Sequence, residues 1–131
     1  MLKITDLDTP SLLLDREIMM NNIKFMQSYA NKYGVNLRPH TKTHKMPALA
    51  KLQVEAGAKG IAVAKVGEAE IMAQNGMDDI FIANEIEGEA KLMRIRELSK
   101  RITISFGIDS IEQTKMIEKI YRKPNPYIAF C

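Results

Sequence analysis

Residues 35–45, with the sequence VNLRPHTKTHK, bring together two lysines, one arginine and two histidines. Apolar residues and proline alternate with polar residues through the first half of this segment, which predicts a strand that runs into a turn. Successive side chains of a strand point to opposite faces, so Arg38, His40 and Lys42 should share one face if the extended geometry persists. Two cations and a titratable ring suit a site that binds an anion or shifts the pKa of an amine.

Lys42 is the candidate nucleophile of this segment. An amine must be neutral to attack a carbonyl, so the ordinary lysine pKa of about 10.4 has to fall toward ~7 to 8. Neighbouring cations and removal from water both act in that direction. Arg38 and Lys45 are close in the sequence, and an apolar wall of strands behind Lys42 would add desolvation. His40 would supply a ring that stacks on a bound group or hydrogen-bonds to it.

Other interpretations of these residues stay open. Composition alone favours an ordinary solvated loop lysine at Lys42. His40 and His44 are four residues apart and could share a zinc ion if the stretch were helical. Pro39 argues against a helix, however, and no third ligand is near in the sequence, so His44 fits a capping or packing role better. Asn84, at the end of a later predicted strand, either binds a ligand or ends the strand, as asparagine often does.

The composition is that of one soluble globular domain. The 131 residues are 46% hydrophobic and 27% charged, with a net charge of +3. Basic residues are interspersed with acids except at 100–101 and 122–123, which favours solvated helix ends over a nucleic-acid surface. Cys131 is the only cysteine, so an intrachain disulfide is excluded. The sequence shows no apolar run of membrane-spanning length and no signal segment, and we expect a cytoplasmic protein without a nucleic-acid or membrane partner.

Short apolar segments alternate with helical patterns along the chain. Met19, Ile23, Met26, Ala30 and Tyr33 lie on one face of the first predicted helix, and we expect this stripe to pack in the core. The predicted helices are 15–33, 47–56, 66–75, 88–100 and 110–121. The predicted strands are 11–14, a strand beginning at 35, 60–64, 79–83, 102–106 and 127–131.

The strands from 35 onward recur about every 19 to 25 residues, which predicts an α/β protein with parallel strands and helical crossovers. A doubly wound sheet of the nucleotide-binding type would carry a Gly-x-Gly-x-x-Gly turn, and its absence favours a (β/α)8 TIM barrel. A complete barrel needs about 250 residues. We therefore expect a partial barrel of about five βα units, with functional residues at the carboxyl ends of its strands: 40–44, 64–65, 84–85 and Asp109.

Two elements resemble one enzyme family. DLDTPS at 6–11 and LRPHTKTHK at 37–45 are similar to the N-terminal barrel part of the D-threonine aldolase and D-serine dehydratase family. These are alanine racemase-like pyridoxal phosphate enzymes of fold type III. In this family the lysine of the Pro-His-x-Lys segment forms a Schiff base with pyridoxal 5′-phosphate, which implies that role for Lys42 and a place beside the cofactor for His40. Weaker matching pieces are Gln53, 57–61, 65–66, 68–69 and 79–85, and the similarity extends to about Ser110.

The resemblance implies a lyase for small D-configured β-hydroxy amino acids. Cleavage of Cα–Cβ would give glycine and an aldehyde, whereas loss of the β-hydroxyl would give an α-keto acid and ammonia. The cofactor would act as the electron sink and the freed lysine would transfer protons. A divalent metal, zinc or manganese, would polarise the β-hydroxyl oxygen, and its ligands are expected in a C-terminal β-domain that the chain does not contain.

The resemblance also implies that residues 1–131 form one truncated cofactor-binding barrel domain. From Lys119 onward the sequence no longer matches the family pattern. We expect the isolated chain to be inactive, and we expect it to form a homo-oligomer because open parallel edges need cover. Two alternatives stay open: a non-catalytic barrel fragment that folds by oligomerising, and a racemase-like pyridoxal phosphate barrel.

Overall fold

The computed structural model describes residues 3–121 and 128–130. Within them, four parallel strands follow one another in chain order across one sheet: β1 (Ile61–Val63), β2 (Asp79–Glu85), β3 (Thr103–Gly107) and β4 (Ile128–Phe130). The crossovers contain helices α3 (Val66–Gln74), α4 (Glu89–Leu98) and α5 (Ile111–Tyr121). These elements confirm the predicted helices and strands to within a residue or two, apart from residues 127 and 131, which lie outside the described residues.

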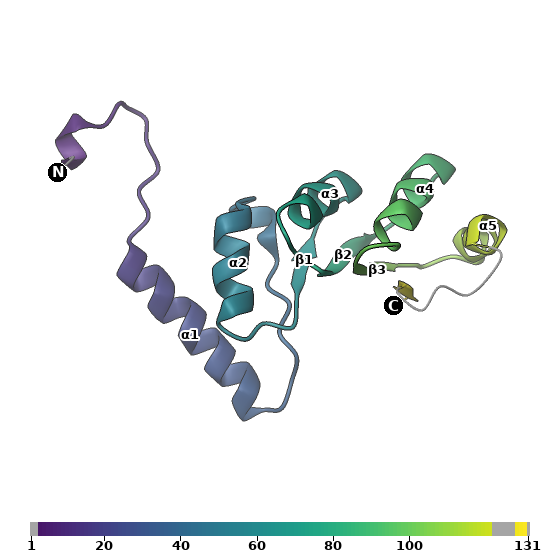
Figure 1. Ribbon diagram of the computed structural model, residues 1–131, viewed down its shortest axis with the longest axis horizontal. Helices are drawn as coiled ribbons and strands as arrows, with labels where there is room; N and C mark the ends of the chain where they lie inside the picture. The colour runs from purple at the N-terminus through teal and green to yellow at the C-terminus, as the bar shows by residue number, and fades with distance from the viewer. Residues whose placement is uncertain (1–2, 122–127, 131) are drawn as a thin grey trace.

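The order of the strands supports the barrel-like interpretation. A doubly wound sheet reverses its strand order and carries helices on both faces. Here the order does not reverse, and Figure 1 shows α3 and α4 on the same side of the sheet. The described residues therefore have the arrangement expected of a portion of a (β/α)8 barrel.

One face of the sheet packs against the helices and forms the core. Ile80 and Ile82 of β2 are fully buried, whereas Phe81 between them is only half-buried. This alternation with a period of two shows that the face of the sheet covered by the helices is more deeply buried than the opposite face. The buried apolar cluster includes Ile61, Val63, Ile80, Ile82, Leu92, Ile95, Ile104, Phe106, Ile117 and Ile120.

The predicted strand beginning at 35 is wrong as a strand. The segment runs beside β1 and forms one isolated parallel bridge, between His40 and Ala62. Its carbonyls accept hydrogen bonds, from Lys59 N–H to Leu37 O at 2.9 Å and from Ala62 N–H to Pro39 O at 2.8 Å. Pro39 has no N–H to return, so the ladder stays incomplete. The segment still enters the sheet edge in parallel, as a first barrel strand would.

The predicted strand at 11–14 is also wrong. Leu12 is 104% exposed and Leu13 is 61% exposed, and these residues pair with no strand of the described sheet. Apolar β-formers make a strand only where a neighbouring strand can accept their hydrogen bonds. The sequence of this segment resembles a strand, but the described part of the chain offers it no partner.

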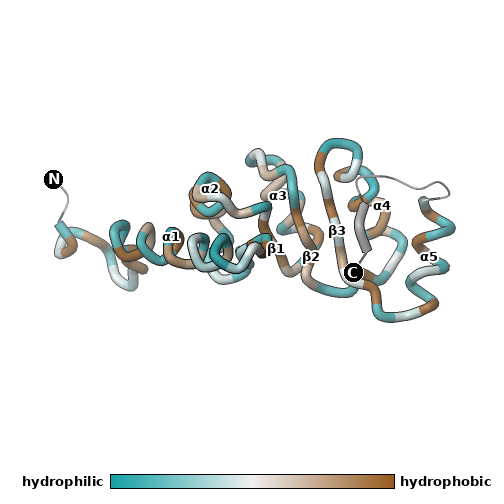
Figure 2. The backbone as a smooth tube through the Cα atoms, turned by 90° about the horizontal axis from the view of Figure 1, so that it is seen from below, coloured by the Kyte–Doolittle hydropathy of each residue, from teal (hydrophilic) through white to brown (hydrophobic). Residues whose placement is uncertain are grey.

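Helix α1 (Arg16–Lys32) forms as predicted, but its apolar stripe is not a core face. The Asp15 carboxylate caps the helix by accepting Ile18 N–H at 2.9 Å. Of the predicted stripe, Ala30 is buried, whereas Met26 and Tyr33 are exposed. The reason is position: α1 lies at one end of the molecule, beyond α2 (Pro47–Glu55), so only a narrow strip of its surface meets the body (Figures 1 and 2).

No helix in the described ranges is long and apolar enough to cross a membrane.

A hydrogen bond from Tyr121 connects α5 to α4. Its hydroxyl donates to the carbonyl oxygen of Leu92 at 3.2 Å, and burial raises its pKa to about 12. The folded chain thus keeps the phenol neutral above the unfolded pKa of about 10, so the stabilisation is complete below pH 10 and is lost as the pH rises toward 12. We expect the free energy of unfolding to fall by about 1 to 2 kcal/mol across that range.

Urea unfolding followed by circular dichroism at several pH values measures this effect. The Tyr121→Phe variant should show a clearly smaller fall between pH 10 and 12. An identical fall in the variant would place the alkaline titration elsewhere in the chain.

Candidate active site

A tight turn carries Lys42 at the carboxyl end of β1. The turn η2 (Thr41–Thr43) follows directly on the bridge between His40 and Ala62. Thr41 is buried, and its hydroxyl donates to the carbonyl oxygen of Ala62 at 3.2 Å. Lys45 N–H returns to Thr41 O at 2.7 Å. These bonds fix the backbone of the turn, while the side chain of Lys42 is exposed above it. The expectation that an apolar wall of strands removes Lys42 from water is therefore wrong for the described residues.

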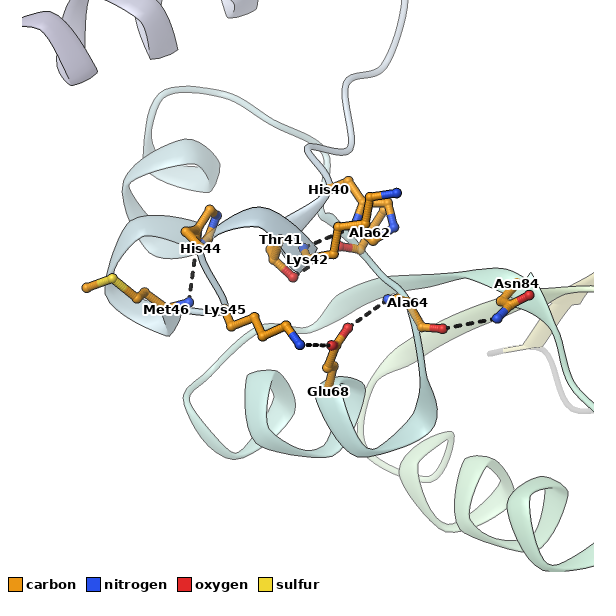
Figure 3. Close-up of polar contacts among 10 residues, drawn as sticks. All are labelled: His40, Thr41, Lys42, His44, Lys45, Met46, Ala62, Ala64, Glu68 and Asn84. Carbon is orange, nitrogen blue, oxygen red and sulfur yellow. Dashed lines mark hydrogen bonds and ion pairs between the residues drawn. The ribbon is translucent and has the colours of Figure 1, made fainter. Parts of the chain in front are cut away.

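His40 lies beside Lys42, and its imidazole ring is neutral. Lys42 N–H donates to His40 Nδ1 at 3.2 Å, so the neutral imidazole carries its proton on Nε2. Burial and the nearby charge of Lys42 lower the pKa of His40, against an opposing effect of the Glu68 carboxylate. Near pH 7 the ring is therefore neutral and presents Nε2–H as a donor. Figure 3 shows His40 and Lys42 at the same edge of the sheet.

The prediction that Arg38 shares this face is wrong. Its guanidinium makes two hydrogen bonds to the Asp79 carboxylate, at 2.9 and 3.1 Å. Asp79 is the first residue of β2, so Arg38 lies toward the amino ends of the strands rather than the carboxyl ends. The alternation also fails beyond His40, where the backbone leaves the extended conformation for η2. A bidentate arginine–carboxylate pair across the sheet edge takes precedence over the local pattern.

Glu68 and Lys45 join the turn to the next helix. Glu68, in the first turn of α3, accepts Ala64 N–H at 2.8 Å through Oε2. Its Oε1 lies 3.2 Å from Lys45 Nζ. Lys45, which was predicted to act on Lys42 as a neighbouring cation, is therefore ion-paired. Figure 3 shows this connection beneath the Lys42 turn.

Asn84 extends the site to the next strand. Its side-chain amide lies 3.5 Å from the carbonyl oxygen of Ala64, and its Oδ1 accepts Glu85 N–H at 3.1 Å. The register of β2 against β3 shifts between Ile82 and Glu85, a bulge that redirects side chains at the end of the strand. Asn84 therefore belongs to the bulged end of β2 at the edge of the site, and its ligand-binding role stays a prediction.

Among the described residues, no hydrogen bond or ion pair joins the Asp109 side chain to this group. Its N–H donates to the Gln113 amide oxygen at 3.0 Å at the start of α5. The contacts among the described residues thus gather the ends of the first segment, β1 and β2, and leave the end of β3 outside the group.

His44 has the capping role that the sequence favoured. Its Nδ1 accepts Met46 N–H at 3.0 Å, where α2 begins. Because the Nδ1 atoms of His40 and His44 both accept backbone N–H groups, each neutral ring carries its proton on Nε2, and neither ring offers zinc a free lone pair in this arrangement. No group of three or more histidine, cysteine or acidic residues in the described part of the chain is placed to hold a metal ion.

Glu68 and Thr41 contribute to the site although residue spacing did not single them out. An acid in the first turn of a helix that follows a strand is a general helix-start signal, and it does not reveal the Lys45 contact. Thr41 is an ordinary turn residue in sequence, and only its burial against Ala62 identifies it.

Comparison with protein families places most of the chain in one family. Residues 14–129 match the model described as the alanine racemase N-terminal domain. The match continues past Lys119, so the expectation that the family pattern ends there is wrong. The D-threonine aldolase of Arthrobacter sp. is 39% identical over 112 residues, which is 86% of this chain and 30% of the relative. The D-threo-3-hydroxyaspartate dehydratase of Delftia sp. is 44% identical over 118 residues, which is 89% of this chain and 31% of the relative.

Solved structures agree with this placement. The crystal structure of a D-threonine aldolase from Filomicrobium marinum superposes with a TM-score of 0.88 at 36% identity, covering 91% of this chain and 32% of that one. A mutant D-threo-3-hydroxyaspartate dehydratase in its metal-free form gives a TM-score of 0.83 at 35% identity, covering 88% of this chain and 31% of that one. The chain thus spans about a third of the length of the relatives it matches.

Proposed function

We propose, from the premise that the chain belongs to the alanine racemase N-terminal domain family, that it supplies the first βα units of a pyridoxal phosphate-dependent lyase. The substrates we propose are small D-configured β-hydroxy amino acids, because relatives that are 39% and 44% identical to the chain over the aligned residues are named for such compounds. The observation that carries the proposal is the exposed amine of Lys42 beside a neutral His40, at the carboxyl edge of the sheet.

The residues at this edge fit the aldehyde end of pyridoxal phosphate. A primary amine that is to bind an aldehyde must be reachable, and Lys42 is exposed and takes part in none of the ion pairs found among the described residues. Lys45, three residues away, is held by Glu68. Lys42 is therefore the better candidate for covalent attachment, with His40 beside the bound ring. We expect the phosphate-binding residues, and the ligands of a divalent metal such as zinc or manganese, in the part of the relatives that this chain does not span.

The residues of the chain have separate tasks in the proposed reaction. When bound, the cofactor withdraws electrons from the substrate Cα. Lys42 would hold the cofactor, and its Nζ, when free, would move a proton at the reacting carbon. His40 presents Nε2–H to the bound groups without adding a positive charge. Thr41 keeps the turn seated on β1, so the amine stays at the edge where the substrate arrives.

Covalent trapping tests the proposal directly. The chain is incubated with pyridoxal phosphate, reduced with borohydride, digested, and analysed by quantitative peptide mass spectrometry. We expect Lys42 to carry at least about ten times more label than Lys45, because Lys42 is unpaired in the described contacts and Lys45 is engaged by Glu68.

The Lys42→Arg variant keeps the charge but cannot form the bond, and it should lose the main labelled peptide. Lys45→Arg is the matched control and should keep it. Labelling spread evenly over the exposed lysines would reject the cofactor assignment and favour the non-catalytic fragment. Product analysis with D-threonine and D-serine, on a protein that includes the rest of the relatives' length, separates aldolase, dehydratase and racemase chemistry.

A further inference from the structure

Glu68 connects two segments that meet at the end of β1. One carboxylate oxygen accepts Ala64 N–H at 2.8 Å and the other lies 3.2 Å from Lys45 Nζ. The Glu68 side chain is 12% exposed, whereas that of Lys45 is 62% exposed. Burial raises the pKa of Glu68, but the Ala64 N–H and the Lys45 amine outweigh it and hold the pKa below its ordinary value. Glu68 is therefore a carboxylate at neutral pH, fixed on the sheet side and reaching out to the turn (Figure 3).

Lys45 is an unusual residue at the far end of this contact. Its φ is +51°, in the left-handed region that residues with a side chain seldom adopt. Its N–H bond to Thr41 O closes the turn in that conformation. A residue held at positive φ needs surrounding contacts that determine it. The Glu68 carboxylate supplies one such contact through the lysine amine.

The Lys42 backbone lies between two anchors. On one side, the bridge from His40 to Ala62 and the Thr41 hydroxyl seat the turn on β1. On the other side, Lys45 is tied to Glu68, which is itself tied to the β1–α3 junction at Ala64. Both anchors end on the same few residues at the carboxyl end of β1. Removing either one would let the turn, and with it the Lys42 amine, move relative to the sheet.

We infer that Glu68 is a positioning residue for Lys42: acting through Lys45 and the Ala64 N–H, it holds the 40–45 turn so that the Lys42 amine stays over the end of β1. This role rests on the proposed function, in which Lys42 binds the cofactor. The positioning itself is a property of the chain without cofactor. It can therefore be measured separately.

Hydrogen exchange measures the positioning without any cofactor. In the 131-residue chain, Glu68→Gln keeps an oxygen for Ala64 N–H and loses the charge that holds Lys45. We expect amide exchange in the 40–46 peptide to accelerate about fivefold, the effect of losing one partly exposed ion pair. Lys45→Met should accelerate it equally, the double variant no further, and Lys45→Arg should stay near the parent rate.

Glu70→Gln is the matched control on the same helix. Glu70 pairs with Arg94 of α4 at 2.7 and 2.5 Å, away from the turn. This variant removes the same kind of charge from α3 and should leave exchange in the 40–46 peptide unchanged. Parent-like exchange in Glu68→Gln, or acceleration equal to that in Glu70→Gln, would overturn the positioning role.

Covalent trapping then links the positioning to Lys42. Over pH 6 to 9, the yield of labelled Lys42 should fall about fivefold in Glu68→Gln and Lys45→Met and stay at the parent level in Glu70→Gln. A fall in exchange protection together with unchanged labelling would overturn the link to Lys42. If the parent chain shows no preference for Lys42, the proposed function fails, and the exchange data still decide whether Glu68 positions the turn.

Discussion

Replacing Gly60 with alanine is expected to lower the free energy of unfolding by about 3 kcal/mol. Gly60 precedes β1, and a Cβ placed there would lie 2.3 Å from the carbonyl oxygen of Asp79 and 2.7 Å from its Oδ1. Real Cβ atoms do not approach a backbone oxygen so closely. Either the start of β1 must move away from β2, or Asp79 must shift and weaken its pair with Arg38.

Gly67→Ala is the control for this prediction. Gly67 lies inside α3, and the nearest atom to its added Cβ is Arg94 Nη2 at 3.7 Å, an ordinary contact. Alanine is the better helix former, so this variant should gain about 0.5 to 1 kcal/mol. Urea unfolding followed by circular dichroism measures both variants. Destabilisation of the same size in both would contradict the close approach of β1 and β2 at Gly60.

Replacing Phe106 with alanine is expected to lower the free energy of unfolding by about 3 to 5 kcal/mol, through lost burial and the cavity left behind. Phe106 is 0% exposed and is the largest of the fully buried side chains described. It lies in β3, in register with Ile82 of β2, inside the cluster between the sheet and the helices. The cluster includes β-branched residues of the sheet such as Ile82 and Ile104, whose restricted rotamers limit how far they can fill the space.

Phe25→Ala is the matched control, with the same atoms removed from an exposed position. Phe25 is 70% exposed on α1, and its loss should change the free energy of unfolding by no more than about 0.5 kcal/mol. The same denaturation series reports both values. Equal losses would show that the core between sheet and helices does not carry the stability of the folded chain.

The sequence predicted the features that depend on local pattern. Buried runs such as the one around Ile80, bounded by turn residues and followed by helical periodicity, identify βα units without reference to the rest of the chain. The placement of Lys42 at the carboxyl edge followed from the general rule for barrels. Both depend on residues near one another in the sequence, which is why a pattern was sufficient.

The features that sequence reasoning missed depend on distant partners. Arg38 finds its carboxylate 41 residues away at Asp79, and no alternation pattern contains that information. Residues 11–14 have the composition of a strand but no neighbour to pair with in the described sheet. The bulge before Glu85 is a property of register between two strands. In each case the conformation of the segment is decided by pairing with a distant part of the chain, which local propensity does not predict.

The strand order has a consequence for how the chain folds. Each strand pairs with the next one in the chain, as Ile61 does with Ile80, Ile80 with Ile104 and Ile104 with Ile128. The paired residues are only about 19 to 24 positions apart, so each pairing closes a single βα crossover and no longer loop. During synthesis from the N-terminus, each βα unit can dock on its predecessor soon after it leaves the ribosome, without waiting for a distant partner.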